Sequence, residues 1–148
     1  MKNVLLRWTW LWGLYPPFLG AGIRVARIAP DFRRLLIRMK LRFWNRNYVG
    51  THYGGSLFSM CDPFYMIMLM RNLGPAYTVW DKEAAIRYRR PGRGTVQAEF
   101  VLPAEVIEEI RAAADRDGKT EKLLTVRVVD EAGETVAEVD KLLWVKRR

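Results

Sequence analysis

NYVGTHYGGSLFSMCD, residues 47–62, is the stretch of sequence that decides the fold. It begins as a polar, glycine-containing loop that carries the only histidine of the chain, His52. From Gly55 onward it becomes strongly apolar, and the apolar character continues to about residue 72. A segment that is apolar on nearly every side predicts a helix enclosed by other protein. We therefore expect a long central helix over residues 55–72, with the rest of the chain packed around it.

Asp62 is the one carboxylate in this apolar segment, about two turns inside the predicted helix. A buried carboxylate is costly unless it is paired or hydrogen-bonded, and the free N–H groups at a helix start bind an oxyanion readily. Pro63 lacks an N–H and would clash with the Ser59 carbonyl, which predicts a kink just after Asp62. A carboxylate combined with an exposed helix start suggests acyl chemistry.

The composition predicts one globular domain over residues 1–148, because the chain is 50% hydrophobic and long enough for one core. A single cysteine and a single histidine exclude a disulfide framework and a Cys/His zinc site built from this chain alone. We therefore expect no metal, and a reducing compartment, the cytoplasm, as the location.

The net charge of +9 is concentrated in the N-terminal half. Residues 1–80 carry eleven Lys and Arg against only Asp31 and Asp62, whereas residues 81–148 carry fourteen charges of each sign. Such a field attracts nucleic acid, an anionic lipid surface or a phosphorylated small molecule. No aromatic-plus-basic motif for nucleic acid stands out, so we expect no nucleic-acid partner.

Residues 8–23 are apolar and rich in tryptophan, and Lys2 and Arg7 precede them, as in a signal peptide. Pro16 and Pro17 interrupt this segment, and its sixteen residues are too few for a straight membrane-spanning helix. We expect residues 1–32 to form a helical extension, with two short helices that meet at the proline pair. Peripheral membrane contact is the alternative that the Trp-plus-basic composition leaves open.

Alternating apolar and polar residues predict five strands, at residues 35–43, 79–90, 95–102, 122–130 and 135–146. The second and third should pair as a hairpin through the turn at residues 91–94, and the last two through residues 131–134. Pro103 should begin a helix that ends before Gly118. This order predicts an α+β fold, a five-stranded antiparallel sheet wrapped around the central helix, whose edge strands pair in a homodimer or homotetramer.

The segment from Asn47 to Gly55, with Asp62 seven places after the second glycine, resembles the hotdog-fold acyl-CoA thioesterases of the phenylacetate-pathway type. The run Tyr88-Arg89-Arg90-Pro91, followed by Gly94, resembles the second-strand signature of the same family. The resemblance covers about residues 33–146, the expected hotdog core, and extends to a hotdog group of largely uncharacterised bacterial proteins.

The resemblance implies hydrolysis of an acyl-CoA thioester without a cofactor. It implies that Asp62 acts as general base or nucleophile, that Asn47 positions water or the thioester, and that the Gly55 N–H polarises the thioester carbonyl. His52, a candidate acid or base, stands one place before the position where relatives carry histidine, which Tyr53 occupies here. The residues expected to bind substrate are Gly54, Thr51 and Tyr53, with Arg87, Arg89, Arg90 and Arg93 for the coenzyme A phosphates.

Each candidate also has a purely structural interpretation. Asp62 can be a carboxylate satisfied by loop N–H groups or by Arg87, and His52 and Asn47 can be loop-forming residues. The arginines can form a solvated hairpin, and Cys61 is expected in the core. Two further functions therefore stay open, a non-catalytic acyl-CoA- or lipid-binding hotdog protein, and a hotdog hydratase or dehydratase that uses His52.

Overall fold

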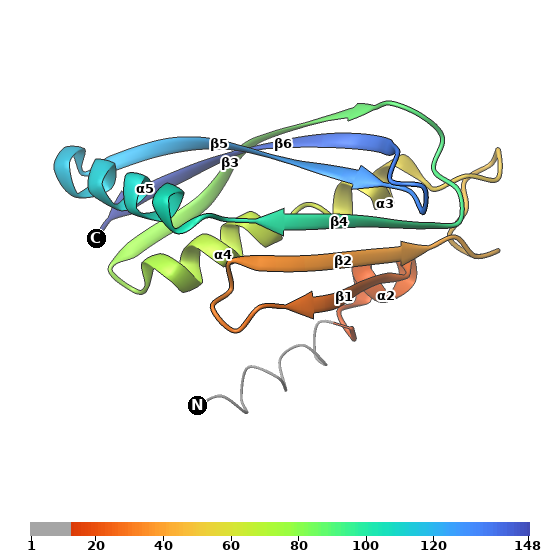
Figure 1. The fold of residues 1–148 in the computed structure, drawn as a ribbon, viewed down its shortest axis with the longest axis horizontal. Coiled ribbons are helices and arrows are strands. Elements are labelled where there is room, and N and C mark those ends of the chain that lie inside the picture. The colour runs from red at the N-terminus through yellow and green to blue at the C-terminus, as the bar shows by residue number, and fades with distance from the viewer. Residues whose placement is uncertain (1–12) are drawn as a thin grey trace.

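The computed structural model describes residues 13–148 as one antiparallel sheet of six strands packed against helices (Figure 1). The helices are α2 (Pro16–Ala21), α3 (Gly54–Ser59), α4 (Phe64–Leu73) and α5 (Ala104–Asp117). The strands are β1 (Ile23–Ile28), β2 (Arg34–Lys40), β3 (Tyr77–Tyr88), β4 (Thr95–Val101), β5 (Lys119–Val129) and β6 (Thr135–Arg147). The strand order is β1-β2-β4-β5-β6-β3, and every neighbouring pair is antiparallel. The α+β class is therefore confirmed, with six strands where the sequence predicted five.

The core lies between the sheet and α4. Alternate residues of β2, Leu35, Ile37 and Met39, are buried, as the predicted two-residue periodicity requires. From α4, the ring of Phe64 lies 5.2 Å from that of Phe100 on β4, and Tyr65 meets Phe100 edge to face at 5.0 Å. These contacts fix α4 against the middle of the sheet, and with it the turn that carries Asp62.

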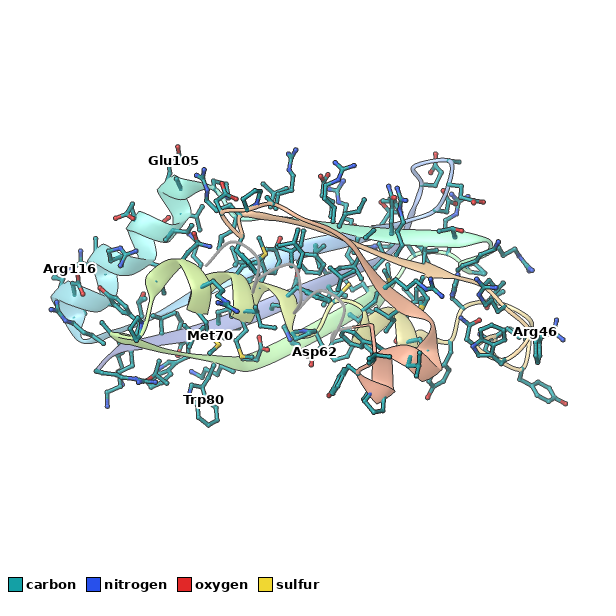
Figure 2. All side chains as sticks on the ribbon, turned by 90° about the horizontal axis from the view of Figure 1, so that it is seen from below. Arg46, Asp62, Met70, Trp80, Glu105 and Arg116 are labelled. Atoms are coloured by element: carbon teal, nitrogen blue, oxygen red, sulfur yellow. The ribbon has the colours of Figure 1, made fainter. Side chains whose placement is uncertain are left out.

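The predicted central helix is two helices rather than one kinked helix. Residues 60–63 form a turn between α3 and α4, because the ring and missing N–H of Pro63 prevent helical bonding back to Ser59. The Asp62 N–H bonds instead to the Ser59 carbonyl at 3.3 Å, and the Pro63 carbonyl accepts the Ile67 N–H inside α4. Asp62 is therefore a turn residue at the junction of α3 and α4, as Figure 2 shows.

The sixth strand comes from the segment that we expected to be entirely helical. Residues 23–28 form β1, which pairs with β2 at the edge of the sheet, so this part of the expected helical extension is a strand. Ile23 and Val25 alternate with the exposed Arg24 and Ala26, a pattern that suits a strand. Pro16 and Pro17 lie in the first turn of α2. The first of the two expected helices lies outside the described residues.

The predicted hairpin between the second and third strands was also wrong. Strand β3 pairs with β6 at one edge of the sheet, whereas β4 lies between β2 and β5. The carbonyl of Val136 accepts the N–H groups of Arg89 and Arg90, so the chain follows β6 beyond the end of β3 before it crosses to β4. A turn-like sequence marks a change of direction but does not identify the strand that is reached.

Strand β2 ends at Lys40, three residues earlier than predicted. The side chain of Asn45 accepts the Arg42 N–H and donates to the carbonyls of Lys40 and Ala21. This closes a turn and leaves Phe43, the last residue of the predicted strand, 79% exposed. Two other predictions are confirmed: β5 and β6 form a hairpin through residues 130–134, and α5 begins after Pro103 and ends at Gly118. No helix of the described residues has the length and apolar character needed to cross a bilayer.

Candidate functional site

Asp62 is held by a lysine from the opposite side of the core. The Nζ of Lys141, on β6, donates to Asp62 Oδ1 at 2.8 Å. The Asp62 side chain is 53% exposed, and Oδ2 has no hydrogen-bond partner among residues 13–148. The pair thus fixes one carboxylate oxygen and leaves the other accessible to water.

Lys141 was missed from the sequence, although a signal for it exists. Its side chain is 1% exposed, and its ammonium lies 5.7 Å from the centre of the Phe58 ring. Along β6 it keeps the same phase as the buried residues Val139 and Leu143, so the alternation places a cation on the inner face. A lysine is almost never fully buried unless it is paired, and this position therefore predicts a carboxylate opposite.

A second carboxylate shares the ammonium. Asp81 Oδ1 on β3 lies 3.3 Å from Lys141 Nζ but makes no hydrogen bond of good geometry. Burial raises the pKa of Asp81, and the Lys141 ammonium acts in the opposite direction. The site is a cluster of two carboxylates and one cation, in which Asp62 is the more exposed acid. The earlier alternative that Arg87 pairs with Asp62 is wrong, because Lys141 takes that place.

The paired glycines allow close packing at the start of α3. A Cβ on Gly54 would lie 2.9 Å from the Tyr88 hydroxyl oxygen, and one on Gly55 would lie 2.6 Å from the Tyr53 ring. The Tyr53 carbonyl accepts the N–H groups of Ser56 and Leu57, which closes the first turn. Within the described chain, the N–H groups of Gly54 and Gly55 have no acceptor, as expected for the first residues of a helix.

Asn47 organises the loop before α3. Its side-chain NH₂ donates to Thr51 Oγ1 at 2.9 Å and to the His52 carbonyl at 3.3 Å. Its Oδ1 accepts the N–H groups of Val49 and Thr51. Both donors and both acceptor sites of the amide are occupied, so Asn47 shapes the loop and has no free position for a water molecule here.

His52 connects this loop to the crossover between β3 and β4. Its Nε2 lies 2.9 Å from the Gly94 carbonyl oxygen, and its backbone N–H donates to the Gly92 carbonyl. A carbonyl only accepts, so Nε2 carries the proton and the buried Nδ1 is the unprotonated nitrogen. Burial lowers the pKa of the imidazole, and the bond to Gly94 opposes this. The side chain is 3% exposed, which suits a loop anchor better than an acid or base.

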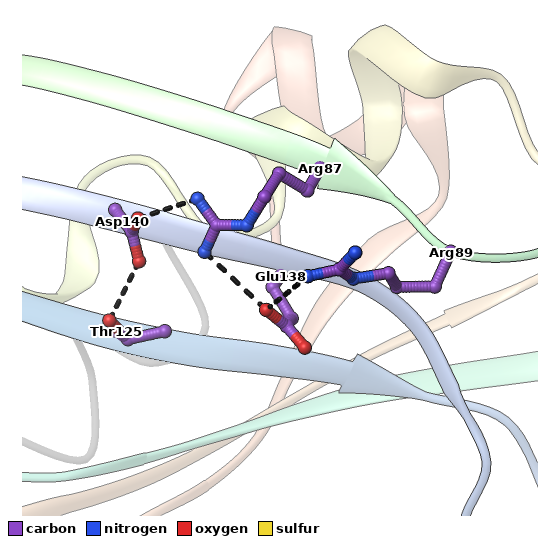
Figure 3. Close-up of polar contacts among 5 residues, drawn as sticks. All are labelled: Arg87, Arg89, Thr125, Glu138 and Asp140. Carbon is purple, nitrogen blue, oxygen red and sulfur yellow. Dashed lines mark hydrogen bonds and ion pairs between the residues drawn. The ribbon is translucent and has the colours of Figure 1, made fainter.

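Three of the four candidate phosphate-binding arginines are paired with carboxylates, and Figure 3 shows two of them, Arg87 and Arg89. Arg87 contacts Asp140 at 2.6 Å and Glu138 at 3.4 Å, and Arg89 contacts Glu138 at 3.2 Å. The hydrogen bond from Arg87 is the main reason that the pKa of Asp140 is lowered. Arg90 pairs with Glu134 at 3.3 Å, so Arg93 is the member of the set without a carboxylate partner in the described structure.

Cys61 lies in the core, and burial raises the pKa of its thiol to about 12. A thiol of this kind is protonated at neutral pH and is a poor nucleophile. No group of three His, Cys, Asp or Glu side chains suited to a metal occurs in the part of the chain that the structure covers.

A family model described as a domain of unknown function, DUF4442, matches residues 7–145. The chain belongs to the DUF4442 family. No protein with a curated description matches this DUF4442 chain in sequence.

Solved structures with the same fold span most of the DUF4442 chain. A Pseudomonas aeruginosa protein of unknown function, described as a probable thioesterase, has a TM-score of 0.76 and 29% identity, over 86% of this chain and 85% of its own. A Chlorobaculum tepidum protein of unknown function has a TM-score of 0.77 and 16% identity, over 98% and 95%. A Haemophilus influenzae thioesterase has a TM-score of 0.67 and 13% identity, over 93% and 87%. The DUF4442 chain therefore shares the hotdog-type fold of these proteins, and the distant two show the fold alone.

Proposed function

We propose that this protein is an acyl-CoA thioesterase that hydrolyses a thioester to a free acid and coenzyme A. The observation that supports it most is the Asp62–Lys141 pair, with one carboxylate oxygen bound and the other open to water. The similarity to a P. aeruginosa protein described as a probable thioesterase supports the same reaction class. The substrate is a small-molecule acyl thioester, and the reaction needs no cofactor.

In the proposed reaction, Asp62 Oδ2 accepts a proton from water as the water oxygen attacks the thioester carbonyl carbon. The negative charge that forms on the carbonyl oxygen is stabilised by the free N–H group of Gly55 at the start of α3. Collapse of the tetrahedral intermediate breaks the C–S bond, and the coenzyme A thiolate takes the proton. In the covalent variant, Asp62 Oδ2 attacks the carbonyl carbon, the C–S bond breaks and coenzyme A leaves as the thiolate. Water then hydrolyses the mixed anhydride to the free acid and regenerates the Asp62 carboxylate.

Lys141 acts in this scheme as a positioning residue. It holds Oδ1, so the carboxylate keeps one orientation and presents Oδ2 outward. Asp81 balances the charge of the ammonium inside the core, where an unpaired lysine would be strongly destabilising. Asn47, Thr51 and His52 contribute indirectly, through a hydrogen-bonded loop that fixes the start of α3.

We propose that a second copy of the chain completes the acyl-binding cleft. Strand β3 is an edge strand of twelve residues, and its only partner in the described sheet is β6. Its middle part, with Ala84 and Ala85, is exposed and presents small side chains. Such an edge pairs readily with an identical strand across a twofold axis. Either a dimer or a tetramer built from such dimers would pair the exposed edge of β3.

A turnover panel distinguishes the candidate functions. Acyl-CoAs of several chain lengths are incubated with the full-length protein, and free thiol is measured with a chromogenic disulfide. Thiol release supports hydrolysis, whereas saturable binding without release would favour a non-catalytic acyl-CoA-binding protein. Hydration of an enoyl-CoA without thiol release would favour a hydratase. The buried, carbonyl-bound His52 argues against that last outcome.

A further inference from the structure

An open groove of about 870 Å³ lies between α2 and strands β1 and β2, outside the proposed site. Figure 1 shows α2 against β1 at this edge of the sheet. One part of the groove is apolar and exposed: Leu14 is 63%, Leu19 is 59% and Trp44 is 53% accessible to solvent. The other part carries four cations and no carboxylate, namely Arg24, Arg38, Lys40 and Arg42.

These four cations have no carboxylate partner within 4 Å in the described structure, unlike Arg34, Arg87 and Arg147 on the same sheet. Arg38 donates only to the neutral Gln97, and Arg42 lies 5.2 Å from the centre of the Trp44 ring. Two acids, Asp130 and Glu131, line a second groove that shares Arg38 with the first. The positive charge of the first groove is therefore uncompensated by the protein.

The strand register places two of the cations directly opposite each other. Arg24 on β1 is the cross-strand partner of Arg38 on β2, and Lys40 follows on the same face of β2. Like charges directly opposite each other destabilise an antiparallel pair. Such an arrangement suits a site where an external anion supplies the missing negative charge.

We propose that this groove docks the protein onto an anionic phospholipid surface. Headgroup phosphates would contact Arg24, Arg38, Lys40 and Arg42, and the exposed Leu14, Leu19 and Trp44 would enter the boundary between headgroups and acyl chains. A soluble phosphate would explain the cations but would leave the exposed apolar side chains unused, so a lipid surface fits both halves of the groove. The sequence before Gly13 adds Trp8, Trp10 and Trp12, with Lys2 and Arg7, a composition of the same kind.

The test is co-sedimentation of the full-length protein with vesicles of phosphatidylcholine, alone or mixed with phosphatidylserine. Binding is expected only with the mixed vesicles, and it should weaken as salt is raised. The double variant Arg24→Gln/Arg38→Gln should weaken it about tenfold or more, because each basic residue adds roughly a factor of five at an anionic surface. Leu14→Ser/Leu19→Ser should weaken it as well.

The matched control is Arg127→Gln/Lys146→Gln, which removes the same charge from exposed positions of the same sheet. It should bind the mixed vesicles nearly as well as the unchanged protein. No binding, equal binding to both vesicle types, or an equal loss in the control variant would overturn the proposal. Titration with coenzyme A or inorganic phosphate gives a further outcome. If either binds through Arg24 and Arg38 while vesicles do not, the groove is a soluble-phosphate site and the proposal is wrong.

Discussion

Lys141 Nζ lies 2.8 Å from Asp62 Oδ1, although seventy-nine positions of sequence separate the two residues. The Lys141 side chain is almost fully buried, whereas the Asp62 side chain is half exposed. This asymmetry distinguishes the pair from ion pairs such as Arg34–Glu99 on the sheet and Arg116–Asp117 on α5, in which both side chains are more than half exposed to water and salt. The pair connects β6 to the junction of α3 and α4, the proposed catalytic position.

The first prediction concerns Lys141→Met, which keeps most of the side-chain volume and removes the charge. Thioester turnover should fall about tenfold to a hundredfold in kcat, because Asp62 loses its fixed orientation, while KM changes little. Thermal stability should decrease as well, because the Asp81 carboxylate, whose side chain is only 25% exposed, loses its cationic partner. Steady-state kinetics and a melting curve measure the two effects.

Lys146→Met is the matched control for that variant, since Lys146 lies exposed on the same strand. It should leave kcat unchanged. Equal activity in Lys141→Met and the unchanged protein would show that the lysine does not position Asp62.

The second prediction concerns pH. Burial lowers the pKa of His52, so the unfolded chain binds a proton on this residue at higher pH than the folded chain does. The stability that His52 contributes is therefore present above the unfolded pKa of about 6.5 and is lost as the pH falls below it. The melting temperature should decrease from pH 7.5 to pH 5.5, and the decrease should be smaller in His52→Gln. An identical pH dependence in the two proteins would refute the burial of a neutral imidazole.

The third prediction concerns the glycines at the start of α3. Gly55→Ala should destabilise the protein by about 1–3 kcal/mol, because its Cβ would overlap the Tyr53 ring. In a Tyr53→Ala background the same change should cost much less, and urea unfolding of the four proteins measures the difference.

Gly20→Ala, inside α2, supplies the comparison for that series. No atom lies within 4 Å of its added Cβ, so it should be neutral or stabilising by about 0.5–1 kcal/mol. If Gly55→Ala behaved like Gly20→Ala, the start of α3 would not require a glycine for close packing.

The fourth prediction separates the arginines around the crossover. Arg93→Gln should raise the KM for acyl-CoA, because Arg93 is exposed and free to meet a phosphate. Arg87→Gln should leave that KM unchanged, because its guanidinium is already bound to Asp140 and Glu138. The test is to measure KM with acyl-CoA and with a short thioester that lacks the nucleotide. Arg93→Gln should raise the KM for acyl-CoA only. If Arg87→Gln raised the KM for acyl-CoA and Arg93→Gln did not, Arg87 would be the residue that binds the phosphates.

The sequence predicts well the features that depend on local pattern. The buried residues of β2, the hairpin of β5 and β6, and the bounds of α5 follow from periodicity and from Pro103 and Gly118. It predicts poorly the features that depend on distant partners. The pairing of β3 with β6 and the early end of β2, closed by Asn45, are set by contacts that no local pattern contains.

The same division holds for the candidate site. Asp62 and the glycines could be found from the sequence, because a lone carboxylate and a Gly-Gly pair beside an apolar run are unusual. The saturated hydrogen bonding of Asn47 and the pairing of Arg87 with Asp140 could not, because both depend on side-chain geometry. Lys141 lies between these cases. The alternation of β6 places its side chain on the inner face, but the sequence does not identify the carboxylate that pairs with it.

The most direct test of the central claim is thiol release by the unchanged protein and by Asp62→Asn, with the same acyl-CoA and with folding verified by circular dichroism. The amide keeps the shape of the carboxylate but neither takes a proton from water nor attacks a thioester. We predict that the unchanged protein releases thiol and that kcat falls at least about a hundredfold in Asp62→Asn. Equal turnover by the two proteins would contradict the proposed role of Asp62, and absence of turnover by the unchanged protein on every acyl-CoA tested would contradict the proposed reaction.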